Sequence, residues 1–283
     1  MTNLLILATD FETEAERFEQ YFEEVEVKSL ADVLIDADTS GKSRVLVEGE
    51  EIKSWDAVYI KPEPKAFNYT RVLMEIIDSE EVSCNLDSSS VFILTKKPYL
   101  FKVLAERGVK IPRQVAISTE KGLTELERDI DLPVLAKKYS YHELTENQIF
   151  GEFEELKSFA ELAEHGEDYL MLQEYHEEEE VFDLLYLNGK IISLKLEEPP
   201  WTSNEGENVS RSYYTVSDDK KEIVNKATES IGTRICRIRM KGDSIVDMSN
   251  EPKLEMFKQE SGKNVYGRIA DILTENIEED GSA

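Results

Sequence analysis

The chain has 283 residues, of which 60 are acidic and 33 are basic, so its formal net charge is −27. Such an acidic excess repels phosphate and anionic lipid headgroups, which argues against general nucleic-acid binding and against binding to membrane surfaces. A hydrophobic content of 40% argues against global disorder. The acidic residues are spread along the chain, which is typical of the solvated surface of a halophilic protein.

Cys84 and Cys236 are the only cysteines, and no secretion signal is recognisable. This pattern predicts free thiols in a reducing, cytoplasmic environment. The N-terminal segment MTNLLILATDFE has no basic region before its short apolar run, so we interpret it as a first strand and not a signal peptide. No stretch approaches the roughly 20 apolar residues of a membrane span.

Strands and helices alternate in the first part of the chain. Asn3–Ala8 is an apolar strand, and Glu12–Phe22 follows with helical spacing. The further elements expected here are strands at Val25–Val27, Arg44–Val47 and Ala57–Ile60 and a helix at Tyr69–Ile77. This alternation predicts an α/β domain with a largely parallel sheet over residues 1–90.

A middle domain is expected over residues 91–175. Helix Lys97–Arg107 ends at Gly108, with Pro112 beyond it, which is a common helix stop. Two more helices are expected at Glu120–Arg128 and Glu154–His165. The strands expected between them are Val115–Ser118, Pro133–Lys137, Ile149–Phe153 and Tyr169–Gln173.

The last domain, residues 176–283, begins with a hairpin signal. Asn188-Gly189 separates the apolar runs Val181–Leu187 and Lys190–Leu196, which indicates antiparallel strands. A strand at Tyr213–Val216, a helix at Asp219–Ile231 and the segments GTRICRIRM and SIVDMSNEPKL follow. The last two predict neighbouring strands that bring Asp247, Ser249 and Asn250 to one edge, where oxygen ligands could hold a metal-bound triphosphate.

Two lysines and one short segment are candidates for ligand contacts. Lys137 ends the buried strand LPVLAK and Lys97 begins a helix, so either ammonium could hold a phosphate or simply reach solvent. The backbone of QEYH, Gln173–His176, could bind an adenine edge in a cleft. The three histidines are dispersed along the chain, which gives little support to histidine-based metal or triad chemistry.

The order of these features resembles the ATP-grasp superfamily, and within it the RimK-like carboxylate–amine ligases. The resemblance covers most of the chain and rests on the order and spacing of motifs that are individually weak. The segments that carry it are WDAVYIKPEP, CNLDSSSVFILTKKPYLFKVLAERGVKIP, LPVLAKK, MLQEYH, SNEGENVSR and IVDMSNEPKLEMFKQESGKNV.

The resemblance implies an α/β protein with α+β lobes: an ATP-grasp fold preceded by a parallel α/β domain at residues 1–90, with a central ATP-grasp subdomain at 91–175 and a C-terminal one at 176–283. It implies ATP and Mg²⁺ as cofactors. Lys97 and Lys137 would hold phosphates, and Asp247 would replace the metal-bridging glutamate. The other residues that it places at the ligands are Gln173, Glu174, Tyr175 and His176 at adenine, Asn204 in a loop, Ser249 in place of the metal-binding asparagine, and Asn250 as a nearby alternative.

The sequence departs from the family pattern in three places. The family's first metal-binding aspartate corresponds to Arg239, and a cation there cannot ligate magnesium. The family's D-I-R strand corresponds to Val181-Phe182-Asp183. Its glycine-rich loop over the triphosphate corresponds to SYHELTENQIFG, which has little of the glycine that close backbone approach to phosphate uses.

Three functions therefore stay open at this point. The first is an ATP-dependent ligase that joins a carboxylate to an amine through an acyl phosphate, with a peptide or protein as a candidate substrate. It predicts that another acidic residue, such as Asp183 or Asp243, completes a metal site with Asp247. The second is a catalytically degraded protein that binds a nucleotide or peptide as a regulatory or partner subunit, with Arg239 holding an anion directly. The third is a small-molecule kinase. A homo-oligomer is implied by the resemblance alone.

Overall fold

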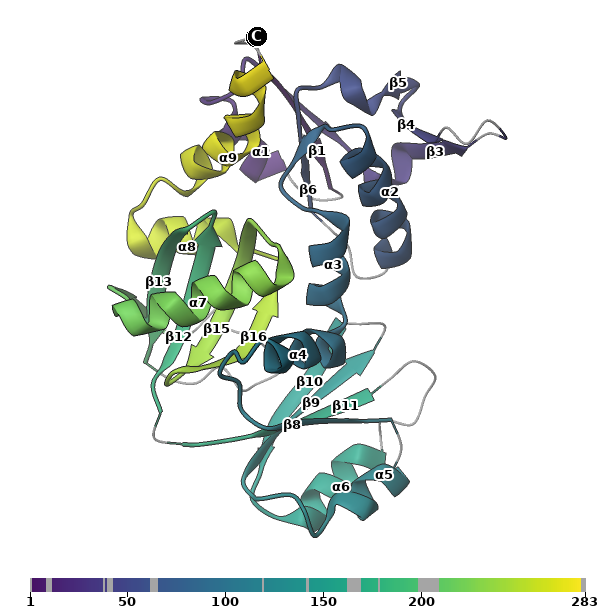
Figure 1. Ribbon diagram of the computed structural model, residues 1–283. Coiled ribbons are helices and arrows are strands. Elements are labelled where there is room, and N and C mark those ends of the chain that lie inside the picture. Colours follow the sequence, from purple (N-terminus) through teal and green to yellow (C-terminus); the bar gives the residue numbers. More distant parts are fainter. Residues whose placement is uncertain are drawn as a thin grey trace.

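The computed structural model describes residues 2–8, 12–37, 39, 43–61, 66–118, 120–140, 143–161, 169–177, 179–197 and 209–280. Figure 1 shows three lobes: a first lobe at the top, a middle lobe at the bottom and a C-terminal lobe between them. No helix in this described part of the chain is both long and apolar enough to cross a membrane.

The first lobe is built on a parallel sheet with the strand order β2-β1-β6-β7, which confirms the parallel arrangement expected from the sequence. Its strands are β1 (Asn3–Leu7), β2 (Glu24–Lys28), β6 (Ala57–Ile60) and β7 (Ser83–Cys84). A small antiparallel sheet contains β3 (Val33–Ala37), β4 (Ser43–Val47) and β5 (Glu50–Glu51). The helices are α1 (Glu12–Phe18), α2 (Phe67–Ser79) and α3 (Ser88–Thr95), and short 3-10 turns lie at Leu30–Asp32 and Ile52–Ser54.

The middle lobe has an antiparallel sheet with the order β10-β9-β11-β8. Its strands are β8 (Gln114–Ile117), β9 (Val134–Ser140), β10 (Glu143–Phe150) and β11 (Tyr169–Glu174). Its helices are α4 (Lys97–Glu106), α5 (Glu120–Leu126) and α6 (Phe153–Glu161). The expected strand at Ile149–Phe153 is wrong in its limits, because β10 starts earlier as the partner of β9 and Phe153 already begins α6.

The two faces of this sheet have different roles. Helices α5 and α6 cover one face, where Val134, Ala136 and Leu172 join their apolar side chains in one core cluster. Because side chains alternate along a strand, Leu135, Lys137 and the residues of β11 next to Leu172 lie on the opposite face. That second face is directed to the C-terminal lobe, since Leu135 packs in a cluster with residues of that lobe.

The C-terminal lobe has a five-stranded antiparallel sheet with the order β14-β13-β12-β15-β16. Its strands are β12 (Val181–Leu187), β13 (Lys190–Leu196), β14 (Arg211–Tyr214), β15 (Ile235–Lys241) and β16 (Ser244–Ser249). The predicted hairpin between β12 and β13 is confirmed, with Asn188 and Gly189 at φ values of 42° and 83°. Helix α7 (Asp218–Ile231) covers one face, where its apolar residues pack on those of β12 and β15.

The register of this sheet aligns three charged residues. Asp183 of β12 lies opposite Arg239 of β15, and Arg239 lies opposite Asp247 of β16. Their neighbours in sequence, such as Phe182 and Ile238, belong to the apolar cluster under α7. The three charged residues therefore project from the other face of the sheet.

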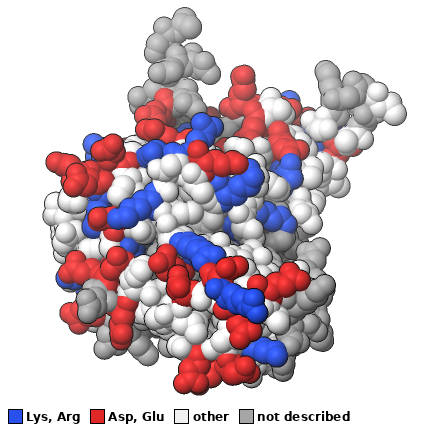
Figure 2. Space-filling view, turned by 60° about the horizontal axis from the view of Figure 1, so that its bottom comes forward, with Lys and Arg blue, Asp and Glu red and all other residues white. Residues whose placement is uncertain are grey.

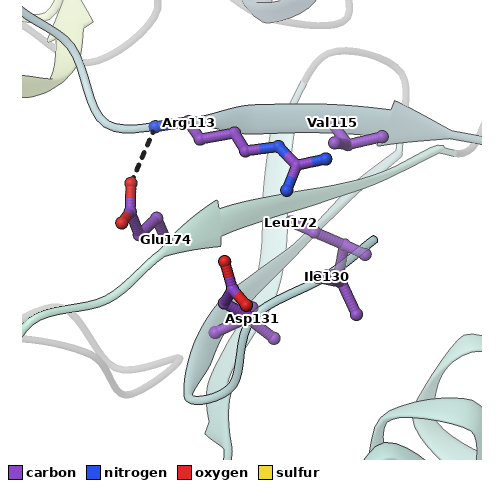
Figure 3. A pocket seen from close by; sticks show the side chains of 7 residues that line it. Arg113, Val115, Ile130, Asp131, Leu172 and Glu174 are labelled. Carbon is purple, nitrogen blue, oxygen red and sulfur yellow. Dashed lines mark hydrogen bonds between the residues drawn. The ribbon is translucent and has the colours of Figure 1, made fainter. Parts of the chain in front are cut away.

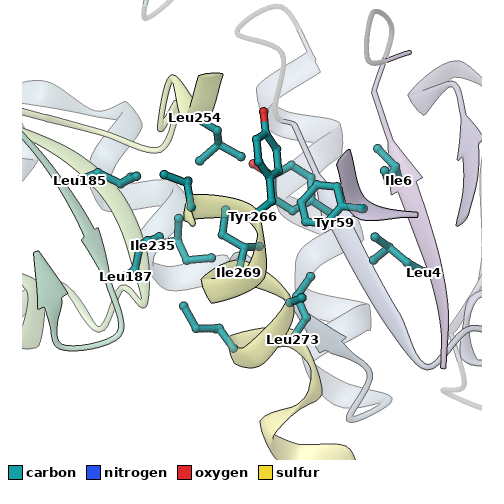
Figure 4. Packing of buried hydrophobic residues seen from close by; sticks show 14 of the residues in the cluster. Leu4, Ile6, Tyr59, Leu185, Leu187, Ile235, Leu254, Tyr266, Ile269 and Leu273 are labelled. Atoms are coloured by element: carbon teal, nitrogen blue, oxygen red, sulfur yellow. The ribbon is translucent and has the colours of Figure 1, made fainter. Parts of the chain in front are cut away.

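The last two helices are α8 (Leu254–Ser261) and α9 (Val265–Asp280). They pack between the first lobe and the sheet of the C-terminal lobe. Figure 4 shows Tyr266 and Ile269 of α9 between Leu4 of the first sheet and Leu185 of the C-terminal sheet, and all four belong to one core cluster. Each fully buried side chain of this kind contributes about 1.5–3 kcal/mol. The C-terminal helix thus fixes the first lobe against the C-terminal lobe. The division at residues 1–90, 91–175 and 176–283 stays a prediction.

Candidate functional site

Two lysines from the middle lobe reach strand β16 of the C-terminal lobe. Lys97 begins α4, which lies between the two lobes in Figure 1, and its Nζ donates to Asp247 Oδ1 at 2.9 Å and to the carbonyl oxygen of Met248. Lys137 of β9 donates from Nζ to the carbonyl oxygen of Val246 at 3.1 Å. Both lysines are buried. Two ammonium groups thus converge on three consecutive residues at the junction of the lobes.

Asp247 is ionised in this setting. Burial raises the pKa of the Asp247 carboxyl, but the charges of Lys97 and then Lys137 outweigh burial and hold that pKa below its usual value. The Asp247 side chain is 28% exposed, so part of it remains accessible to solvent. Lys97 nevertheless occupies one of its oxygens.

Asp183 lies among three arginines. It receives hydrogen bonds from Arg237 Nη2 at 2.8 Å and from Arg239 Nε at 2.9 Å, and Arg211 Nε lies 4.0 Å away. The Asp183 side chain has no exposed surface. Burial alone would raise the pKa of Asp183, but the charges of Arg239 and Arg237 hold it well below its usual range.

These contacts form one buried charge network, because Arg239 also acts electrostatically on Asp247. Among the residues that the structure describes, the contacts above join the carboxylates of Asp183 and Asp247 to basic side chains of Lys97, Lys137, Arg211, Arg237 and Arg239. Exposed Glu260 adds a weaker attraction for Arg211. On the face shown in Figure 2, Lys and Arg side chains are interspersed with Asp and Glu side chains.

The cleft-directed face of the middle sheet carries buried polar atoms without hydrogen-bond partners. In the described part of the chain these are both amide atoms of Gln114, Gln173 Oε1, Asn147 Oδ1 and the hydroxyl of Tyr169. Gln173 pairs with Gln114 across β11 and β8, and Asn147 pairs with Lys137 across β10 and β9, so all share one face. Unpaired buried polar groups are unfavourable and mark a place that a polar ligand or water completes. Gln114 and Asn147 were missed in the sequence, although period-two alternation places them on the face of Gln173 and Lys137.

The segment after β11 borders a cavity of about 240 Å³. Glu174, His176 and Lys241 line it, with Glu174 Oε1 and His176 Nε2 3.2 Å apart. Lys241 Nζ sits 3.5 Å from the centroid of the Tyr175 ring. Burial lowers the pKa of Lys241 to about 8, against the opposing effect of the nearby glutamates at 177 and 179. Val246 also lines the cavity, so it adjoins the contact made by Lys137.

A smaller cavity, shown in Figure 3, lies on the helix-covered face of the same sheet. Its walls include Arg113, Val134 and Leu172, and Glu174 Oε2 accepts a hydrogen bond from the backbone N–H of Arg113 at 3.3 Å. The volume is about 40 Å³. That is room for one or a few waters, so we do not assign a ligand to it.

The described residues at β16 do not fit a divalent cation. Asp247 is flanked by two cations, Lys97 on its own oxygen and Arg239 opposite it in the sheet, and both repel a metal ion. Ser249 accepts at Oγ from the backbone N–H of Glu251 at 3.1 Å, and Asn250 follows the end of β16. No three Cys, His, Asp or Glu side chains come together for a metal among the residues described.

Neither proposed substitute ligand is available to Asp247. Asp183 is enclosed by arginines, and Asp243 lies in the turn between β15 and β16, where it binds Lys220. Asn204 lies outside the described residues, as do Tyr141 and His142 of SYHELTENQIFG. Of the rest of that segment, Ser140 ends β9, Glu143–Phe150 forms β10, and Gly151 follows it.

No protein-family model and no curated protein matches this sequence. Solved structures do match. The RimK domain ATP-grasp protein from Sphaerobacter thermophilus is 15% identical, with a TM-score of 0.71 over 96% of this chain and 99% of that one. The ATP-grasp ligase PsnB, in complex with a precursor variant, Mg and ADP, is 13% identical, with a TM-score of 0.73 over 96% and 97%. D-alanine–D-alanine ligase from Bacillus anthracis, in complex with ATP, is 13% identical, with a TM-score of 0.66 over 97% of both chains. The chain therefore has the ATP-grasp fold over nearly its whole length.

Proposed function

We propose that this chain binds ATP in the cleft between the middle and C-terminal lobes. The convergence of Lys97 and Lys137 on β16, next to a cavity of about 240 Å³, is the observation that carries the proposal. The ammonium groups would hold phosphates as point charges. The adenine would occupy the cavity beside Glu174 and His176, where backbone groups bind its edge.

The unpartnered polar groups of the middle sheet support a polar ligand at this place. Gln114 and Gln173 lie side by side on the cleft-directed face, close in sequence to the proposed adenine segment. An ATP molecule offers hydrogen-bond donors and acceptors along its base and ribose. Binding would therefore satisfy groups that are otherwise buried without partners.

Calorimetric titration of ATP into the purified chain, in buffer with high KCl, tests the proposal. Lys137→Ala removes one ammonium from the cleft, and we expect the ATP affinity to fall by about tenfold or more, since charge-assisted bonds to phosphate are strong. Lys138→Ala is the matched control, because Lys138 is the next residue of β9 and points to the other face. Equal affinities of the two variants would contradict the phosphate role of Lys137.

Ligation of a carboxylate to an amine is the second candidate function. It is favoured by the similarity to solved ATP-grasp ligases, some of them in complex with precursor peptides. In such a reaction a carboxylate oxygen attacks the γ-phosphorus of ATP and displaces ADP. The amine nitrogen then attacks the acyl carbon and displaces phosphate. A peptide is the substrate class that we propose for this activity.

Phosphate release tests the ligase candidate. The chain is incubated with ATP, Mg²⁺, glutamate-rich peptides as carboxylate donors and lysine-containing peptides as amines, and phosphate and product mass are measured. Release that requires both peptides would support ligation. A chain that binds ATP under these conditions and releases no phosphate beyond the rate without protein would speak for binding alone.

A further inference from the structure

A cavity that the proposed ATP site does not use lies where α3 and α4 meet the start of β11 (Figure 1). Its volume is about 520 Å³, which is typical of a site that binds a small ligand or a side chain. Tyr99, one of its walls, is 42% exposed, so the cavity is accessible from solvent. The described residues that line it are three aromatic side chains, one proline and one lysine: Phe92, Tyr99, Tyr169, Pro98 and Lys96.

The aromatic walls of this cavity are held in place by other side chains. The rings of Phe92 and Tyr99 meet edge to face, with their centroids 5.6 Å apart. The Tyr169 ring stacks on Tyr139 with a centroid distance of 5.0 Å and an angle of 10° between the ring planes. Lys102 Nζ lies 5.8 Å from the centroid of Tyr99. Because these rings are already fixed, an aromatic group that enters the cavity is buried with little further loss of conformational entropy.

The hydroxyl of Tyr169 provides an unsatisfied donor at this wall. It is buried and has no hydrogen-bond partner among the described residues. A buried hydroxyl without an acceptor is unfavourable, so a ligand that brings an acceptor gains by completing it. A carboxylate is the strongest acceptor of this kind, whereas an ammonium group has only donors to offer. The hydroxyl therefore favours a ligand with a carboxylate over a ligand with an amine.

The cavity adjoins the proposed phosphate site. Lys96 and Pro98, which line it, flank Lys97 in the sequence. Burial and then the charge of Asp247 raise the pKa of Tyr169, and the backbone N–H of Lys97 opposes them, so the Tyr169 hydroxyl lies near both residues. The ammonium of Lys97 pairs with Asp247, which offsets the repulsion between Asp247 and a second carboxylate. A carboxylate held by Tyr169 would thus lie beside the phosphate end of the cleft.

We propose that this aromatic cavity binds the aromatic side chain of the carboxylate substrate, while the substrate carboxylate accepts a hydrogen bond from the Tyr169 hydroxyl. The substrate class is a peptide in which an aromatic residue adjoins a glutamate or an aspartate. For its reaction the inference rests on the proposed ligase function, because this carboxylate would be the one that attacks the γ-phosphorus of ATP. Binding of the peptide itself requires no ATP.

Calorimetric titration of three acetylated and amidated peptides, without ATP, tests the ligand class. Their sequences are Ala-Phe-Glu-Phe-Ala, Ala-Ala-Glu-Ala-Ala and Ala-Phe-Gln-Phe-Ala. We expect the first to bind about tenfold more tightly than the second, because an aromatic side chain is buried. It should bind about fivefold more tightly than the third, which has no charged acceptor. Equal affinities of the first two peptides would overturn the inference and leave the proposed ATP site intact.

Two tyrosine variants place the peptide in the cavity. Tyr99→Ala removes one wall and is expected to lower the affinity for the Phe-Glu-Phe peptide by about fivefold or more. Tyr69→Ala is the matched control, because Tyr69 is similarly exposed, at 38%, but lies on α2 and bonds to the carbonyl oxygen of Val33. Equal affinities of these two variants would overturn the inference.

Tyr169→Phe tests the hydroxyl and also serves if Tyr99→Ala does not fold. The change keeps the ring that stacks on Tyr139 and removes only the donor. We expect it to abolish the preference for the glutamate peptide over the glutamine peptide, while the preference for phenylalanine over alanine stays. An unchanged preference for glutamate would contradict the position assigned to the carboxylate.

Phosphate release separates this inference from the proposed ligase function. The two glutamate peptides are compared with ATP, Mg²⁺ and a lysine-containing peptide as the amine. We expect the KM for the Phe-Glu-Phe peptide to be about tenfold lower than for the alanine peptide. Peptide binding that depends on Tyr99, without any phosphate release, would support the cavity as a peptide site and contradict ligation. Phosphate release with equal KM values for the two peptides would support ligation and overturn the inference.

Discussion

Lys97 and Asp247 are 150 positions apart in the chain and form an ion pair of 2.9 Å across the junction of two lobes. The pair does two things at once. It joins the first residue of α4 to β16, and it neutralises the carboxylate that would have to accept a metal ion. A change at either partner therefore distinguishes a site that holds phosphates through lysine side chains from a site that holds them through a metal ion.

Asp247→Asn is expected to strengthen ATP binding by about three- to tenfold, because it releases Lys97 and removes a negative charge near the phosphates. A metal-dependent site gives the opposite sign, since loss of a ligand weakens binding of the metal complex. The measurement is calorimetric titration of ATP with EDTA and with MgCl₂. Asp243→Asn, an exposed change in the turn that precedes β16, is the control. Weaker binding by Asp247→Asn, with Asp243→Asn unchanged, would contradict the lysine-based site.

Asp183→Asn is expected to destabilise the chain by about 3–5 kcal/mol at neutral pH, the usual effect of leaving buried charges without their partner. Arg237 and Arg239 would lose their carboxylate. Urea unfolding at constant KCl measures the difference, and Asp271→Asn in the exposed pair with Arg268 is the control. A loss no larger than that of Asp271→Asn would show that the arginines have another counterion.

The same variant predicts a pH dependence. The folded-state pKa of Asp183 is held below its unfolded value of about 3.9, so its stabilising effect is fully present above that value and is lost as the pH falls further. The difference between the parent chain and Asp183→Asn should accordingly shrink when the pH is lowered below about 4. Urea unfolding at several pH values between neutrality and pH 3 measures it, and a difference that stays constant would contradict the shift.

Much of the fold could be predicted from local patterns. The limits of β6, β12 and β13 agree with the prediction, because Asn188-Gly189 and the apolar runs around it determine a hairpin locally. Helix α3 was missed, since it begins with three serines, which favour helices only weakly. Its N-terminal signal was nevertheless present, because Asp87 accepts from the backbone N–H of Ser90 as a helix cap.

The site is only partly visible in the sequence. The pattern indicated Lys97, Lys137, Arg239 and Asp247, and the structure brings all four together. It did not indicate which charges pair, because the pairing of Asp183 with Arg239 depends on the register of strands that are far apart in sequence. What the four residues bind stays a prediction.

Lys241→Met is expected to raise the melting temperature at pH 7. Burial lowers the pKa of Lys241 to about 8, so the folded chain holds an unfavourable charge below that pH, whereas the unfolded chain keeps its proton up to about pH 10.4. Stability of the parent chain should therefore rise between these values, and the advantage of Lys241→Met should shrink. Thermal unfolding from pH 7 to pH 10 measures both. An advantage that is absent at pH 7 would show that the contacts with Tyr175, Glu177 and Glu179 outweigh burial.

Exchange of the paired charges of Asp183 and Arg239 tests whether Arg239 stands where a metal site would need a carboxylate. Arg239→Asp alone puts a second carboxylate next to buried Asp183, and we expect it to destabilise the chain by several kcal/mol. The double change Asp183→Arg with Arg239→Asp keeps an ion pair between β12 and β15 and places a carboxylate opposite Asp247 in register. Because two carboxylates can share a divalent ion, the double variant should bind ATP more tightly with MgCl₂ than with EDTA, the reverse of the parent chain.

Arg237 remains beside the new arginine, so part of the stability is still lost. If the double variant folds and its ATP affinity does not rise with MgCl₂, position 239 does not face the phosphates. The arginines would then serve only to hold Asp183.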